Sequence, residues 1–213
     1  MRPARLATLL LLATGACAGP RAPPSPPART FVYDCPPGPG FVARVEPGAA
    51  WLFLPARTVR LLATPAASGA LFEGEGVAYW SHGQQATLER AGQPPAECRN
   101  DPARAVWEDA KLRGVDFRAS GNEPAWTLEL SERRRIVLVT GLGAERAELT
   151  AGPPETDAAA GRTAYLAEGG GHRLLLTIEA GPCTDSMSGE ALAARVTVRL
   201  DGVEYRGCGR APH

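Results

Sequence analysis

Glycine and proline interrupt this chain so often that they leave room for short elements only. The 213 residues include 24 glycines and 20 prolines, and apolar and polar residues still alternate between the interruptions. An alternation with a period of two is typical of strands that have one buried and one solvated face. The sequence therefore predicts an all-β protein built from many short strands.

The strand pattern occurs in two regions with a different segment between them. In the first region we expect strands near residues 31–35, 41–46, 50–55, 59–63, 77–81 and 86–89. Asp101 and Pro102 then predict the start of a helix, since Asp is a preferred N-cap residue and Pro is tolerated at the first helical position. We expect two domains joined by a short helical connector at residues 100–113. The first, residues 30–99, is predicted to be a small antiparallel β-barrel, and the second, residues 114–213, a β-rich domain.

The N-terminus has the features of an export signal. Arg2 and Arg5 precede a short apolar stretch at residues 6–13. A bilayer-spanning helix needs ~20 apolar residues, so this stretch is too short to span a membrane and is typical of a signal peptide. The sequence predicts export out of the cytoplasm.

The end of this signal peptide resembles a lipobox. The residues Thr-Gly-Ala-Cys end at Cys17, which predicts a signal peptide of residues 1–17 and a lipid such as palmitate on that cysteine. An ordinary cleavage after Ala18 is the alternative. The proline-rich residues 18–29 predict an extended tether. We therefore expect a periplasmic lipoprotein that is anchored to the outer membrane.

The cysteine count agrees with export. Once Cys17 is assigned to the lipid, an even four remain in an oxidising compartment. Four cysteines permit three pairings, and their order along the chain favours Cys35–Cys98 and Cys183–Cys208. Their spacing lacks the C-x-x-C pattern that is typical of zinc sites and of thioredoxin-like redox sites.

Three motifs in the first region resemble a known family. Tyr33-Asp34-Cys35 is followed by A-A-S-G-A-L-F at residues 66–72 and by Y-W-S-H-G-Q-Q-A-T-L at residues 79–88. In this order they resemble the membrane-bound lysozyme inhibitors of c-type lysozyme (MliC), whose patterns are S-A-S-G-A-R-Y and F-W-x-K-G-x-x-A-x-L. The resemblance implies a small eight-stranded antiparallel barrel and c-type lysozyme as the partner.

The resemblance also implies a contact site. In the family, a Ser and a Lys from these motifs enter the lysozyme cleft and contact its two catalytic carboxyl groups, one protonated and one ionised. A hydroxyl bonds either form, and a cation pairs with the ionised one. The matching positions here are Ser68-Gly69 and His82-Gly83. His82 replaces the family Lys and Leu71 replaces the Arg, so two permanent cations are missing.

Each of these residues has a structural alternative. Ser68-Gly69 also fits an ordinary tight turn, and His82 also fits an exposed loop position. We expect Trp80 to be a core aromatic of the barrel. The alternative function is a structural or ligand-binding envelope module that does not inhibit lysozyme.

The second region contains two motifs of its own. They are G-N-E-P-x-W at residues 121–126 and C-x-D-x-M-S-G at residues 183–189, which resemble an uncharacterised domain of bacterial envelope lipoproteins. Glu123 and Asp185 are candidates for an acid–base pair. A structural interpretation is favoured, in which Glu123 belongs to a turn and Asp185 caps backbone amides.

Other functions are disfavoured by composition and spacing. The 23 basic residues equal the 23 acidic ones, so no general field attracts nucleic acid. The three histidines lack metal-ligand spacing, and we expect no metal and no cofactor. Gly141-Leu142-Gly143 begins like a dinucleotide fingerprint, but Arg146 stands where the last glycine belongs. We therefore expect a binding protein with no catalytic residues.

Overall fold

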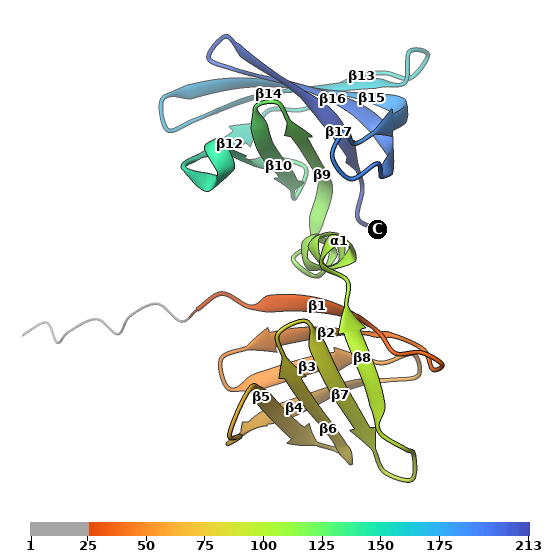
Figure 1. Ribbon diagram of the computed structural model, residues 1–213. Coiled ribbons are helices and arrows are strands. Elements are labelled where there is room, and N and C mark those ends of the chain that lie inside the picture. The colour runs from red at the N-terminus through yellow and green to blue at the C-terminus, as the bar shows by residue number, and fades with distance from the viewer. Residues whose placement is uncertain (1–25) are drawn as a thin grey trace, which may run out of the picture.

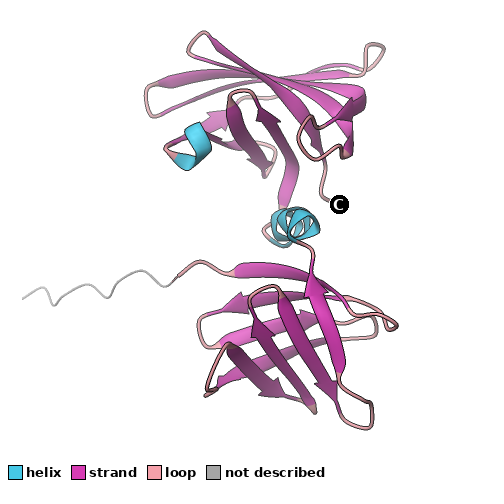
Figure 2. Ribbon diagram, viewed as in Figure 1, coloured by secondary structure: helices cyan, strands magenta, loops and turns pink. Residues whose placement is uncertain are grey.

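The computed structural model describes residues 26–213, which form strands β1 to β17, one α-helix and one short 3-10 helix. They are arranged in two strand-rich units with the helix α1 between them (Figure 1). Strands dominate both units (Figure 2), which confirms the predicted all-β class with a short helix as the joint. The predicted signal peptide, Cys17 and most of the predicted tether lie outside the described residues.

The first unit is a closed antiparallel barrel of eight strands, each paired with its neighbour in sequence. The first strand closes the circle by pairing with the last, at Tyr33 with Asn100 and at Asp34 with Arg99. This confirms the predicted first barrel. Its strands are β1 (Arg29–Asp34), β2 (Phe41–Glu46), β3 (Ala49–Phe53), β4 (Thr58–Thr64), β5 (Ala70–Gly74), β6 (Val77–His82), β7 (Gln85–Arg90) and β8 (Ala96–Asn100).

Alternation along these strands fills the barrel with aromatic and aliphatic side chains. Tyr33 and Tyr79 are fully buried, and their hydroxyl groups lie 3.0 Å apart, so each provides a partner for the other. Burial raises the pKa of both phenols. The disulfide Cys35–Cys98 joins the end of β1 to β8. The first barrel therefore has a core and a covalent closure of its own.

The second unit is a nine-stranded antiparallel sheet in the order β12-β11-β10-β9-β17-β16-β15-β14-β13. Additional pairing of β12 with β14, at Thr150 with Glu168 and at Ala151 with Ala167, closes eight of these strands into a second barrel. The remaining strand β13 lies outside this circle. The strands are β9 (Val115–Asn122), β10 (Ala125–Ser131), β11 (Arg135–Thr140), β12 (Glu145–Ala151), β13 (Glu155–Asp157), β14 (Arg162–Gly169), β15 (His172–Thr184), β16 (Ala191–Leu200) and β17 (Val203–Arg210).

The second barrel also has a separate core and its own disulfide. Trp126, Leu128, Leu138 and Leu176 belong to a buried cluster that includes no residue of the first barrel. The disulfide Cys183–Cys208 lies outside this cluster, beneath the helix. Both predicted disulfide pairings are therefore confirmed.

Helix α1 (Pro102–Leu112) starts as its sequence predicts and packs against the second barrel. The Asp101 carboxylate accepts hydrogen bonds from the backbone N–H groups of Ala103 and Arg104, at 3.0 and 3.1 Å. Trp107 packs against Leu192 and the disulfide of the second barrel, with the Arg210 guanidinium 4.3 Å from the centre of its ring. Among residues 26–213, no helix is long and apolar enough to cross a membrane.

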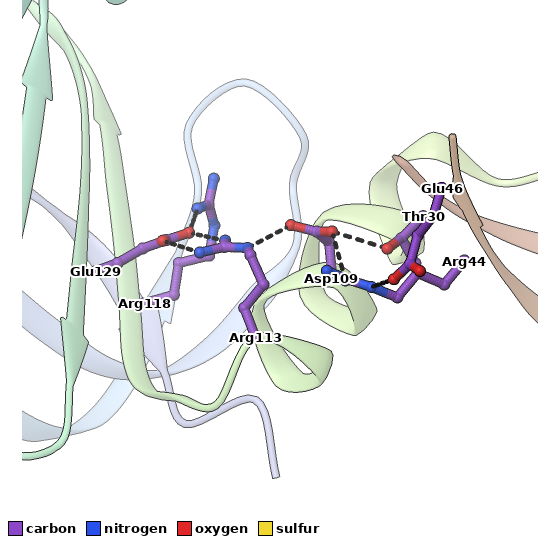
Figure 3. Close-up of polar contacts among 7 residues, drawn as sticks. All are labelled: Thr30, Arg44, Glu46, Asp109, Arg113, Arg118 and Glu129. Carbon is purple, nitrogen blue, oxygen red and sulfur yellow. Dashed lines mark hydrogen bonds and ion pairs between the residues drawn. The ribbon is translucent and has the colours of Figure 1, made fainter. Parts of the chain in front are cut away.

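A chain of polar contacts runs from the first barrel through the helix to the second barrel (Figure 3). Asp109 of α1 accepts a hydrogen bond from Thr30 of β1 at 2.8 Å and pairs with Arg113 at 2.7 Å. Arg113 in turn forms two hydrogen bonds, at 2.6 and 2.7 Å, to the Glu129 carboxylate on β10. Arg118 of β9 pairs with the same carboxylate. These contacts fix the helix to both barrels.

The structure differs from the sequence prediction at a few elements. Strands β5 and β8 were not among the predicted positions, because each has few buried residues between turns. The short strand β13 has three exposed residues and no alternation that marks it in the sequence. Residues Gly141–Gly143 form a 3-10 turn between β11 and β12. A dinucleotide site requires a helix after its glycines, and here the next element is the strand β12.

Candidate functional site

The two predicted contact motifs lie side by side at one end of the first barrel. Ser68-Gly69 lies in the loop before β5, and His82-Gly83 lies where β6 turns into β7. Pairing of Ala70 with Ser81 places the two segments next to each other. All four residues are exposed, so the side chains of Ser68 and His82 are available to a partner.

Gly69 is required by the close approach of these two segments. Its backbone has a φ of +68°, a conformation that favours glycine. A Cβ at this position would lie 2.4 Å from the Ser81 carbonyl oxygen and 3.0 Å from the Trp80 indole nitrogen. Gly83 also has a positive φ, of +62°, but a Cβ there would meet nothing within 4 Å. Of these two glycines, Gly69 alone combines a positive φ with neighbouring atoms too close for a Cβ.

Trp80 holds the Ser68 loop from the outer face of the barrel. Its Nε1–H donates a hydrogen bond to the Ser68 carbonyl oxygen at 2.9 Å. The side chain is 42% exposed, while Val77 and Tyr79 of the same strand are buried. The expectation that Trp80 is a core aromatic is therefore wrong. The alternation of buried residues along β6 contained the signal, because it places Trp80 on the opposite face from Tyr79.

Ser68 and His82 share one hollow of about 260 Å³ on this face. Its other lining residues are Trp80, Gln85, Ala86, Thr87 and Glu97. Glu97 of β8 accepts a hydrogen bond from the Thr87 hydroxyl at 3.0 Å. The hollow thus brings a hydroxyl, an imidazole and a carboxylate to one surface, the first two from the predicted motifs and the third from a residue that the sequence did not single out.

Leu71 adds an apolar side chain to this surface. It lies on β5 directly across from Trp80 and is half-buried. The family Arg at this position would extend a cation over the same face. The rim around the two loops therefore presents a leucine, a tryptophan and an imidazole.

The two acid–base candidates of the second barrel occupy turn and loop positions, and Asp185 has structural partners there. Asp185 accepts hydrogen bonds from the Ser188 and Met187 backbone N–H groups, at 2.8 and 3.1 Å, and from the Asn122 amide at 3.1 Å. Chiefly through the Ser188 amide, these bonds lower the pKa of Asp185. Glu123 lies in the turn between β9 and β10, on a cis peptide bond to Pro124. Asp185 therefore caps the backbone of its own loop, and its hydrogen bond from Asn122 joins this loop to the turn after β9.

The described part of the chain contains no group of three or more His, Cys, Asp or Glu side chains placed to hold a metal ion. The site on the first barrel is a surface with two exposed loops and the hollows beside them.

Comparison with protein families found a match in the first barrel. Residues 33–97 match the family described as membrane-bound lysozyme-inhibitor of c-type lysozyme. The match contains both loops and ends one residue before Cys98, which confirms the resemblance in the N-terminal unit. Comparisons with curated proteins and with solved structures gave no match.

Proposed function

We propose that this chain is an exported, lipid-anchored envelope protein whose first barrel inhibits c-type lysozyme. In this proposal the Ser68 and His82 loops enter the active-site cleft and contact its two carboxyl groups. The observation that carries it is the convergence of both loops on one hollow, within a segment that matches a family of lysozyme inhibitors. The partner is c-type lysozyme, and the site requires no cofactor.

The chemistry of the two loops fits a pair of carboxyl groups. A serine hydroxyl donates to an ionised carboxylate and accepts from a protonated one. An imidazolium pairs with an ionised carboxylate, and this pairing is stronger in a cleft that excludes water. Histidine changes its charge between about pH 5 and 8, whereas the family Lys does not. Inhibition that depends on His82 should therefore weaken as the pH rises.

The first prediction follows from this difference in charge. We expect the wild-type protein to inhibit a purified c-type lysozyme more tightly near pH 6 than near pH 8. His82→Lys should flatten this profile and improve inhibition at pH 8, because the lysine stays charged. Inhibition constants of the mature protein across this range measure the effect.

Two variants serve as controls for this experiment. His82→Ala reports the pH dependence that does not come from the imidazole. Ser68→Ala removes the hydroxyl and leaves the imidazole in place. If the wild type and His82→Ala had the same inhibition constant at every pH, His82 would have no role in the contact. If the wild type gave no inhibition at all, the alternative of a non-inhibitory envelope module would replace this proposal.

A further inference from the structure

The outer face of the first barrel beside the two loops presents its side chains in cross-strand rows. One row joins Glu73, Ala78 and Glu89 across β5, β6 and β7. The next row joins Leu71, Trp80, Thr87 and Glu97 across β5 to β8. Trp80 therefore has an acidic row on one side and the His82 loop on the other.

Trp80 separates two hollows on this face. The hollow shared by Ser68 and His82 lies on one side, and a larger one of about 440 Å³ lies on the other. The larger hollow is lined mostly by apolar side chains. Its lining is Ala66, Ala67, Ser68, Leu71, Glu73, Ala78, Trp80, Thr87 and Glu89. Together the two hollows make a groove, which we call the Trp80 groove, that starts at the Ser68 loop.

The charges of the Trp80 groove have mostly one sign. Glu73, Glu89 and Glu97 line it, and no arginine or lysine does, in a chain with 23 of them. Among residues 26–213, these three carboxylates form no ion pair within 4.0 Å. Arg90 lies in an adjoining hollow that Glu73 and Glu89 also line, and it is not among their ion-pair partners. Carboxylates around an exposed indole are thus available to a cation from outside.

An exposed indole beside carboxylates favours one kind of cationic group from a partner. A guanidinium stacks on an indole face and at the same time donates parallel hydrogen bonds to carboxylates. An ammonium group is a compact, strongly hydrated point charge and makes this double contact less well. Arginine is also enriched at protein interfaces, whose energetic centres are often Trp, Tyr and Arg.

We propose that the Trp80 groove receives an arginine side chain that c-type lysozyme presents beside its cleft, between the Trp80 ring and the carboxylates of Glu73 and Glu89. This inference rests on the proposed function. The groove is continuous with the candidate inhibitory site, because both hollows include Ser68. At the Leu71 side of the site, the sign of the recognition charge is then the reverse of that in the family motif. The family Arg is missing there, and acidic side chains receive a cation from the partner.

The test neutralises two of the three carboxylates of the groove and leaves its shape unchanged. Glu73→Gln/Glu89→Gln should raise the dissociation constant for a purified c-type lysozyme roughly five- to twentyfold at low salt, and less at high salt, because exposed charge pairs are screened. The matched control is Glu132→Gln/Glu155→Gln on the second barrel, which removes the same charge from exposed positions. The control should bind as the wild type does. Titration calorimetry of the mature protein at both salt concentrations gives the constants.

A second arm identifies the side chain that the partner contributes. The titrations are repeated with lysozyme whose arginines have been made neutral by a diketone, and with lysozyme whose lysines have been acetylated. We expect the wild type and Glu73→Gln/Glu89→Gln to bind the arginine-modified lysozyme equally, and to differ still on the lysine-acetylated one. A difference that persists on the arginine-modified lysozyme would overturn the proposal.

The outcomes separate this inference from the proposed function. If the wild type inhibits lysozyme and Glu73→Gln/Glu89→Gln binds equally well at both salt concentrations, the groove has no role while the inhibitory function stands. If the wild type neither binds nor inhibits lysozyme, the proposed function fails and the inference fails with it.

Discussion

Gly69 and Gly83 show at the scale of single residues how the first barrel can present two loops to a partner. Both glycines adopt a left-handed backbone, and both lie beside a residue of the candidate site. They differ in surroundings, since only Gly69 lies against the backbone of β6 and the Trp80 indole. Contact between the loops therefore depends on the absence of a side chain at one of the two positions.

This difference predicts a contrast between two matched substitutions. Gly83→Ala places an alanine at a positive φ in open space and should cost about 1 kcal/mol of stability. Gly69→Ala carries the same strain and also forces the Ser68 loop away from Ser81, so it should weaken lysozyme inhibition at least tenfold. Thermal unfolding and inhibition assays on both variants measure the two effects. Equal inhibition by both variants would show that the loop contact is unnecessary.

Helix α1 is the element that sets the two barrels in relation to each other. Trp107 packs against the second barrel, while the Asp109 carboxylate accepts a hydrogen bond from Thr30 of the first barrel. The carboxylate of Glu129 then holds Arg113 and Arg118 together at the far end of the contact chain. Burial acts to raise the pKa of Glu129, but the two guanidinium groups outweigh it and hold that pKa below its usual value.

The lowered pKa of Glu129 predicts an acid-sensitive contribution to stability. A carboxylate whose pKa is lowered on folding stabilises the fold above its unfolded pKa of about 4.3, and this contribution is lost as the pH falls through the folded pKa. Glu129→Gln should cost about 1–3 kcal/mol near pH 7, because it removes the carboxylate that pairs with the half-buried Arg118 and leaves Arg113 with its pairing to Asp109. The difference from the wild type should shrink below about pH 4. Denaturant titrations at several pH values measure it.

A surface carboxylate serves as the control for this prediction. Glu168 pairs with Arg173 on the second barrel, with side chains that are 67% and 78% exposed. Glu168→Gln should change the unfolding free energy by less than about 0.5 kcal/mol at any pH, as is usual for exposed pairs. A difference for Glu129→Gln that stayed constant down to pH 3 would contradict the assigned role of its charge.

The elements that could be predicted from the sequence are those with a strong local signal. Asp101 and Pro102 marked the start of α1, and the alternation of apolar and polar residues marked six of the eight strands of the first barrel. Strand β13 was missed because all three of its residues are exposed, so no buried face marks it. Ser68 and His82 were found through their motifs, but Glu73, Glu89 and Glu97 were not. Their proximity to Trp80 depends on cross-strand register, which is a property of the closed barrel.

At the scale of the whole molecule, the described residues form two closed barrels that carry different sequence motifs. The first matches a family of lysozyme inhibitors over residues 33–97, and the second carries motifs whose polar groups bond to one another. Each barrel has its own core, and the polar chain through α1 connects them.

The proposed anchor makes a prediction about where the protein is found. Cys17→Ser should release the mature protein from membranes or leave its signal peptide uncleaved, because a lipidated cysteine is the attachment point. Membrane fractionation and labelling with a fatty-acid analogue measure this. Wild-type protein that takes up no label would contradict the lipid anchor and favour ordinary cleavage after Ala18.

The order of the cysteines along the chain has a consequence for maturation under the proposed export. Cys98 lies in the last strand of the first barrel, so both partners of the first bond precede Cys183 and Cys208 in the chain. Domains generally fold as units, N-terminal first. In the proposed export we therefore expect the first barrel to close its disulfide before the thiols that could mispair with it arrive. Such a chain would need an oxidant at the channel exit and would have little need of an isomerase to rearrange wrong pairs.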